Sequence, residues 1–215
     1  MDIKYKTYWR KTGLKGKWGD IYLNFIKKHK PKNFLEIGVF CGVTARNTCN
    51  LLNQIHGNDF KYVGIDLFGE QKTTSSDEIA PSFLKDQRFS NPFKNIYYNF
   101  ILKEKLNSLE SVSKFLKKYK NNIQLIKGDT NIVLKGLELK NLDYVFIDGG
   151  HSYNTVINDL KILYKNLKGK KKILLCDDYG KESYIPEVKN AIDDFVQENS
   201  LNLNLVENRF AEIIT

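Results

Sequence analysis

The segment Asp148-Gly149-Gly150-His151-Ser152 holds the residues of this sequence best suited to chemistry. Two glycines allow a sharp turn after Asp148, and Ser152 is of a type that caps helices, so His151 is expected just before a helix. A neutral imidazole can accept a hydroxyl proton near pH 7. His151 is therefore a candidate general base, and the alternative is a histidine that only orders this loop.

Two further carboxylates, Asp177 and Asp178, follow an apolar run and join Asp148 at the predicted ends of adjacent strands. Three carboxylates at one edge repel one another unless a proton or a divalent cation relieves the charge. Oxygen ligands favour a hard ion, so Mg²⁺ bound by Asp148, Asp177 and Asp178 is one hypothesis. Such an ion would lower the pKa of a substrate hydroxyl. The alternative for Asp177 is a helix or loop cap.

A second group of residues indicates a ligand that is not a dinucleotide. Gly38 and Gly42 lie where a strand turns into a helix, and Glu36 stands at the strand end. Glycines there let the backbone approach a ligand, but a carboxylate repels pyrophosphate and suits a cationic or amino-bearing group. Asp66 closes the next apolar run, where an acidic residue can bind ribose hydroxyls. The alternatives are a simple tight turn and, for Asp66, a cap.

These residues need a sheet to position them, and apolar runs alternate with segments of helical period along the chain. The expected strands are 33–37, 61–66, 123–127, 142–148 and 172–177, followed by 201–206 and 209–215. The expected helices are 19–30, 43–55, 131–137, 152–167 and 186–199. Because Glu207 and Asn208 alone separate the last two strands, these must pair as an antiparallel hairpin. The prediction is an α/β fold with a mostly parallel seven-stranded sheet and helices on both faces.

One domain over residues 1–215 is the simplest organisation, with an N-terminal helical extension at 1–30. The stretch 69–122 interrupts the alternation and contains helical segments near 78–86 and 108–119. An insertion of that size between strands is typical of a lid or substrate cover. Its aromatic side chains either line an acceptor site or pack the insertion itself. They are Phe83, Phe89, Phe93, Tyr97, Tyr98 and Phe100.

Five segments, each at the end of a predicted strand, together resemble the class I S-adenosylmethionine-dependent methyltransferases, in the branch with an Ile-Asp-Gly-x-His-x-Tyr segment. The resemblance spans about residues 32–198. The segments are Leu35-Glu36-Ile37-Gly38 with Gly42, Gly64-Ile65-Asp66, Lys127-Gly128-Asp129-Thr130, Phe146-Ile147-Asp148-Gly149-Gly150-His151-Ser152-Tyr153 and Asp177-Asp178-Tyr179-Gly180. The sequence departs from the family in having Lys168-Gly169-Lys170-Lys171 in place of Pro-Gly-Gly, and in lacking the middle glycine of the first motif.

The resemblance implies a Rossmann-like methyltransferase fold and a role for each motif. Glu36, Gly38, Gly42 and Thr44 would surround the methionine part of S-adenosylmethionine, Asp66 would hold the ribose, and Asp129 with Thr130 would flank the adenine. Asp148 would adjoin the cofactor and act with His151 in catalysis. Related O-methyltransferase branches bind a metal through an aspartate after the fourth strand and an acidic pair after the fifth, which are the places of Asp148 and of Asp177-Asp178 here. Many close relatives in the His-x-Tyr branch resemble one another in having a His-Asp pair instead of that acidic pair.

The implied reaction is methylation of a hydroxyl on a small molecule such as a sugar or polyol. The net charge of +9 keeps RNA methylation as an alternative, but only four of the 34 cations are arginine and the lysines are dispersed. A third alternative is a catalytically inactive cofactor-binding protein. No apolar run is long enough to span a membrane, and the odd number of cysteines favours reduced thiols. We therefore expect a cytoplasmic protein, with a homo-oligomer as one option.

Overall fold

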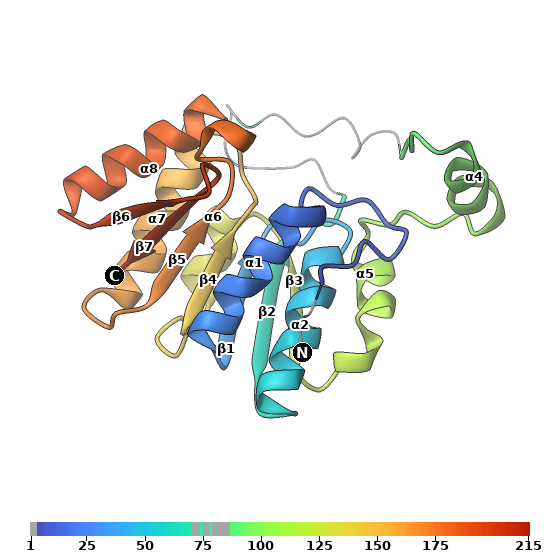
Figure 1. Cartoon of the computed structure of the whole chain (residues 1–215), viewed down its shortest axis with the longest axis horizontal. Helices are drawn as coiled ribbons and strands as arrows, with labels where there is room; N and C mark the ends of the chain where they lie inside the picture. Colours follow the sequence, from blue (N-terminus) through green and yellow to red (C-terminus); the bar gives the residue numbers. More distant parts are fainter. Residues whose placement is uncertain (1–3, 70–73, 75–77, 79–86) are drawn as a thin grey trace.

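A seven-stranded sheet forms the centre of the molecule, with helices on both of its faces (Figure 1). The structure is a computed structural model that describes residues 4–69, 74, 78 and 87–215. The strand order is β3-β2-β1-β4-β5-β7-β6. Neighbours pair in parallel except for β7, which runs antiparallel to both β5 and β6. The predicted fold class is therefore confirmed.

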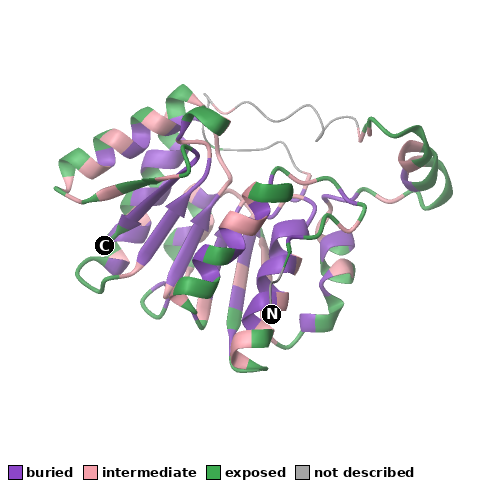
Figure 2. Cartoon of the chain, viewed as in Figure 1, coloured by how far each residue is buried: buried purple, intermediate pink, exposed green. Residues whose placement is uncertain are grey.

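The parallel strands are β1 (Asn33–Ile37), β2 (Lys61–Asp66), β3 (Ile123–Lys127), β4 (Tyr144–Ile147) and β5 (Ile173–Cys176). The first three have the predicted bounds, and β4 and β5 are shorter at each end. β4 and β5 are buried along their whole length (Figure 2), which explains their continuous apolar sequence. The hairpin strands are β6 (Leu203–Val206) and β7 (Phe210–Ile214). Three residues join them where two were expected, because the Arg209 amide closes the turn on the Val206 carbonyl at 3.0 Å.

Side chains of successive strand residues point to opposite faces of the sheet, and each face has its own helices. The first face packs Phe34, Tyr62 and Phe146 against helices α1 (Gly16–His29), α2 (Val43–His56) and α5 (Leu109–Phe115). The second packs Leu35, Val145 and Leu174 against helices α7 (Tyr153–Leu167) and α8 (Pro186–Glu198) and the short α6 (Thr130–Val133). Every expected helix that falls within the described residues is present, and those predicted at 131–137 and 108–119 each end in a 3₁₀ turn.

The strand order places a crevice at the carboxyl ends of β1 and β4. From β1 the chain winds outward through β2 and β3, and from β4 it winds the other way, so the loops after β1 and β4 diverge. Open α/β sheets bind ligands at such a switch point. The backbone ladder continues into these loops, since the Gly38 amide donates to Ile65 at 2.9 Å and the Asp148 amide donates to Ile37 at 2.8 Å.

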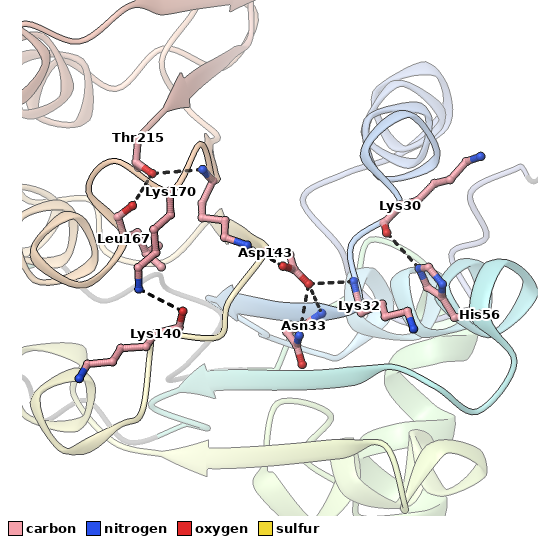
Figure 3. A network of polar contacts seen from close by, with 10 residues as sticks. Lys30, Lys32, Asn33, His56, Lys140, Asp143, Leu167, Lys170 and Thr215 are labelled. Atoms are coloured by element: carbon pink, nitrogen blue, oxygen red, sulfur yellow. Dashed lines mark hydrogen bonds and ion pairs between the residues drawn. The ribbon is translucent and has the colours of Figure 1, made fainter.

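At the amino ends of the strands, opposite this crevice, the sheet is held together by Asp143 (Figure 3). Its Oδ2 accepts hydrogen bonds from the backbone amides of Lys32 and Asn33 at 3.1 and 2.9 Å, and its Oδ1 accepts from Lys172 Nζ at 2.9 Å. One carboxylate thus connects the beginnings of β1, β4 and β5. This edge is structural, which leaves the carboxyl edge for chemistry.

Within the described part of the insertion, α4 (Pro92–Asn95) and the π-helix that follows it (Ile96–Ile101) extend away from the sheet (Figure 1). α5, in contrast, packs against the sheet. Phe93 and Phe100 are 74% and 72% exposed, so these two aromatics do not pack the insertion. Apart from Glu78, the helix predicted near 78–86 lies outside the described residues, as does Phe83. No helix in the described ranges is long and apolar enough to cross a membrane.

Candidate active site

A cavity of about 490 Å³ opens at the carboxyl edge of the sheet. Its wall comes from the loops after β1, β2, β3, β4 and β5, with contributions from the N-terminal segment and the hairpin. A volume of this size suits a small-molecule ligand. The predicted site residues in the wall are Gly38, Thr44, Asp66, Asp129, Thr130, Asp148, His151 and Asp178. Glu36, Gly42 and Asp177 were also predicted but are not part of the wall.

Asp66 lies at the end of β2 with its carboxylate oriented by the backbone. Its Oδ2 accepts from the Phe40 amide at 2.8 Å, and its Oδ1 accepts from the Phe68 amide at 2.6 Å. Burial raises the pKa of Asp66, and these two hydrogen bonds oppose that rise. Each carboxylate oxygen has two acceptor positions, so both can also accept from a ligand hydroxyl.

Asp129 and Thr130 form the wall after β3. Asp129 caps α6, with Oδ1 accepting from the Asn131 amide at 2.9 Å and Oδ2 accepting from Thr74 Oγ1 at 2.8 Å. Thr130 begins the helix and is 9% exposed. The capping arrangement fixes this rim of the cavity.

Gly38 is required by a close approach of two loops. Its φ is +92°, and a Cβ there would lie 1.9 Å from the carbonyl oxygen of Asp148. No other residue type fits this contact, which lets the loops after β1 and β4 meet across the crevice. On the same side, Thr44 Oγ1 shares a hydrogen bond of 2.8 Å with the Tyr5 hydroxyl.

Two predicted cofactor residues have structural positions instead. Glu36 is fully buried on the α1 and α2 face of β1, where its Oε2 accepts from the Tyr62 hydroxyl at 2.8 Å. Burial raises the pKa of Glu36 to about 8. Gly42 is the N-cap of α2 with φ of +75°, and its Cα faces Val112. The alternation of side chains along β1 turns Glu36 away from the cavity, which corrects the expectation that it lines the site.

His151 is held from both its backbone and its ring. Its backbone amide donates to Glu78 Oε1 at 2.9 Å, and its Nε2 lies 3.4 Å from Asp178 Oδ2. The Asp178 carboxylate raises the pKa of His151, and burial opposes that rise. Ser152 caps α7 as predicted, with its Oγ accepting from the Thr155 amide at 3.2 Å. His151 and its carboxylate partner Asp178 are therefore neighbours in the cavity wall.

Asp178 adopts a left-handed backbone conformation with φ of +60°. Aspartate tolerates this region better than most residues, but the conformation is uncommon and is concentrated at functional sites. The turn separates Asp178 from its neighbour: Asp178 points to His151 and also accepts from the Ser183 hydroxyl. Asp177, one residue earlier, points to the hairpin.

Asp177 forms a bidentate ion pair with Arg209. Arg209 Nε and Nη2 donate to the two Asp177 oxygens at 2.7 and 2.6 Å, and the residues are 7% and 3% exposed. Burial by itself would lower the pKa of Arg209, but its hydrogen bonds with Asp177 raise it, so the guanidinium stays charged. Burial raises the pKa of Asp148 well above its ordinary value, and the neighbouring Asp177 and Asp178 add to the rise.

The predicted Mg²⁺ site does not fit this arrangement. Both oxygens of Asp177 already accept from a permanent cation, and Asp178 is engaged by His151 and Ser183. Among the described residues, no group of three or more His, Cys, Asp or Glu side chains is arranged to hold a metal ion. The crowding of carboxylates was expected correctly, but a guanidinium relieves it.

Several wall residues were not anticipated from the sequence. Lys11, Thr12 and Gly13 come from the N-terminal segment, Glu78 from the insertion and Arg209 from the hairpin. Glu78 accepts hydrogen bonds from the backbone amides of His151 and Ser152, at the N-terminus of α7 where a carboxylate is favoured. None of these residues lies in a recognisable motif. Arg209 alone stands out in the composition, because the chain has only four arginines.

Among solved structures, several share this fold at low sequence identity. Cofactor-bound Rv0187 from MTB matches with a TM-score of 0.63 and 11% identity, covering 95% of this chain and 82% of that chain. SAH-bound methyltransferase PaMTH1 of Podospora anserina matches at 0.59 and 16%, covering 93% and 79%. The O-methyltransferase TomG of Streptomyces achromogenes matches at 0.56 and 11%, covering 94% and 79%.

A comparison with curated proteins finds no match. The methyltransferase domain family, in contrast, matches residues 35–179, from the middle of β1 to just beyond β5. That span is more than half of the 215 residues and contains most of the cavity wall. The chain therefore belongs to the methyltransferase domain family.

Proposed function

We propose that this methyltransferase uses S-adenosylmethionine to methylate a hydroxyl group on a small molecule. The observation that carries the proposal is a single cavity bounded by the ribose-type acceptor Asp66 and by the His151–Asp178 pair. One feature suits a nucleoside donor and the other suits removal of a hydroxyl proton.

The wall fits the donor in shape and in charge. Gly38 brings backbone to the crevice without a side chain, and the apolar Ile37, Val39 and Ile65 flank it. Asp66 can accept hydrogen bonds from ribose hydroxyls, and Asp129 and Thr130 form the rim at which an adenine would lie. The Asp178 carboxylate favours a positively charged sulfur over a phosphate. Lys11, which is also part of the wall, would attract the methionine carboxylate.

S-adenosylmethionine supplies, when bound, a methyl group on a sulfonium that is open to in-line attack. The protein's part is to align the acceptor oxygen with that methyl and to take its proton. In the neutral ring, Nε2–H of His151 donates to Asp178, so Nδ1 receives the proton and Asp178 stabilises the resulting imidazolium. Arg209 and Asp177 keep the neighbouring carboxylates in place.

The acceptor is a small, polar molecule, such as a sugar or other polyol. The polar groups His151, Asp178, Ser183 and Arg209 gather at the β4 and β5 end of the cavity, where they can hydrogen-bond several hydroxyls. All three cysteines are buried free thiols, which agrees with a reducing compartment and a cytoplasmic location.

Calorimetry with S-adenosylmethionine, followed by a screen of hydroxyl acceptors, tests the proposal. Asp66→Asn removes a charged acceptor of two hydroxyls, so we expect the Kd to rise about tenfold or more. Asp59→Asn is the matched control, since Asp59 is exposed and pairs with Lys32 at the other edge of the sheet. An unchanged Kd in Asp66→Asn would contradict the proposed pose.

The acceptor class is tested in the same assay. A small-molecule enzyme should be nearly indifferent to salt, whereas turnover stimulated by RNA and suppressed steeply by salt would favour the RNA alternative. A protein that binds the donor but methylates nothing in either screen would favour the inactive cofactor-binding alternative.

A further inference from the structure

Arg209 sits where the sequence led us to expect a metal ion. It is 7% exposed, reaches the cavity wall, and holds both oxygens of Asp177. Planar guanidinium groups match carboxylates in this two-point geometry, and their charge does not depend on pH. The cluster therefore contains its own permanent positive charge.

The side chain is fixed by packing as well as by the ion pair. Its guanidinium carbon lies 5.5 Å from the centres of the Trp18 and Phe210 rings. Its backbone carbonyl accepts from the amides of Tyr179 and Gly180 at 3.2 and 2.9 Å. The hairpin and the loop after β5 are thus joined at Arg209, so the guanidinium cannot leave without disturbing both.

Their close contact is visible at Gly180. A Cβ on Gly180 would lie 2.0 Å from the Asn208 carbonyl oxygen, which means that only glycine lets the loop after β5 meet the hairpin here. Glu207 and Asn208 take left-handed φ values of 52° and 55° to make the turn that presents Arg209. Several unusual backbone positions thus serve this one side chain.

A guanidinium and a divalent cation are mutually exclusive at Asp177. Each would have to share the same two oxygens, and the like charges would repel at close range in a buried site. Removal of the guanidinium, in contrast, would free both oxygens of Asp177, whose charge acts on nearby Asp148 together with that of Asp178. Free carboxylate oxygens beside other carboxylates are ligands that hard cations bind.

We propose that Arg209 replaces a divalent cation in this active site, so that it positions the carboxylates and the enzyme needs no metal. The inference rests on the proposed function only for its consequence on turnover. Arg209 acts as a positioning residue. It holds Asp177, which positions the adjacent Asp178, and Asp178 in turn positions His151.

The test is a titration of chelator-treated protein with Mn²⁺ alone, followed by electron paramagnetic resonance of the free ion. Wild type should bind no stoichiometric Mn²⁺ up to about 1 mM. Arg209→Gln should gain one Mn²⁺ site whose Kd is at least about tenfold below that concentration. The double variant Arg209→Gln/Asp177→Asn is the matched control and should lose the gained site. Donor binding and turnover of wild type should be unchanged by EDTA.

Two results would overturn the inference: one Mn²⁺ bound by wild type and lost in Asp177→Asn, or folded Arg209→Gln that binds no more Mn²⁺ than wild type. Arg209→Met, which keeps the apolar length of the side chain, serves if Arg209→Gln does not fold. A protein that binds no S-adenosylmethionine would refute the proposed function, while the Mn²⁺ titration would still decide the role of Arg209.

Discussion

The left-handed backbone at Asp178 brings a carboxylate to His151 Nε2, and this pair sets the pH at which a proton can be accepted. Asp178 raises the pKa of His151 above its ordinary 6.5. A general base works in its deprotonated form, so the rate should increase as the pH passes upward through this raised pKa. The Asp178 carboxylate therefore shifts the deprotonation of His151 to higher pH, and it also stabilises the imidazolium that forms.

Asp178→Asn separates these two effects. Without the charge, the pKa of His151 should fall, so the rising limb of the kcat profile should move to lower pH. The plateau should drop about tenfold or more because the imidazolium loses its partner. Asp194→Asn, a carboxylate of α8 that bonds Tyr153, is the control. A limb that does not move, or full activity in His151→Ala, would remove His151 from the proton transfer.

At the scale of elements, the N-terminal segment covers one side of the cavity and is attached by Arg10. The guanidinium donates to the Cys41 and Leu106 carbonyls at 2.9 and 2.7 Å and to Ser111 Oγ at 2.9 Å. It also lies 4.5 Å from the centre of the Phe115 ring. One buried side chain thus ties the segment to the start of α2 and to the insertion, directly beside Lys11, Thr12 and Gly13 of the wall.

Arg10→Ala should release this segment. Three buried acceptors would lose their donor, so we expect a loss of about 2–3 kcal/mol in unfolding free energy and a roughly tenfold weaker donor affinity. Urea unfolding and calorimetry measure the two effects. Lys15→Ala, an exposed change at the edge of the same segment, should alter neither. Undiminished donor affinity in a destabilised Arg10→Ala would mean that the segment supports the fold alone.

The place of the N-terminal segment in the site could not be predicted from the sequence, whereas much of the fold could. The strands at 33–37, 61–66 and 123–127 could be predicted residue for residue, because each is a short run rich in apolar and β-branched residues, even though β3 lies at the edge of the sheet and has no fully buried residue. The positions of motif residues at strand ends, such as Asp66 and His151, followed from the predicted strands. The pairing of Arg209 with Asp177 and the docking of Arg10 are long-range side-chain contacts with no local pattern. Glu36 was misplaced because its motif position does not reveal which face of β1 it occupies.

For the molecule as a whole, the position of Glu36 makes folding stability depend on pH. Its side chain is fully buried between the sheet and its helices, Oε1 has no partner in the described part of the chain, and its pKa is raised to about 8. The folded state therefore binds this proton more tightly than the unfolded state, in which the pKa is ordinary. The resulting stabilisation is complete below the unfolded pKa of about 4.5 and is lost as the pH rises toward about 8.

Glu36→Gln removes the ionisation and keeps the shape. Between pH 5 and 8 the unfolding free energy of wild type should fall by on the order of a few kcal/mol more than that of the variant, because only wild type must bury a charge. Urea unfolding without ligand at several pH values measures the difference, with Glu110→Gln on the exposed side of α5 as control. Parallel curves for wild type and Glu36→Gln would show that Glu36 ionises at no cost to the fold. A pH-dependent difference seen with Glu36→Gln and not with Glu110→Gln would instead mean that the fold holds Glu36 as a neutral acid in its core.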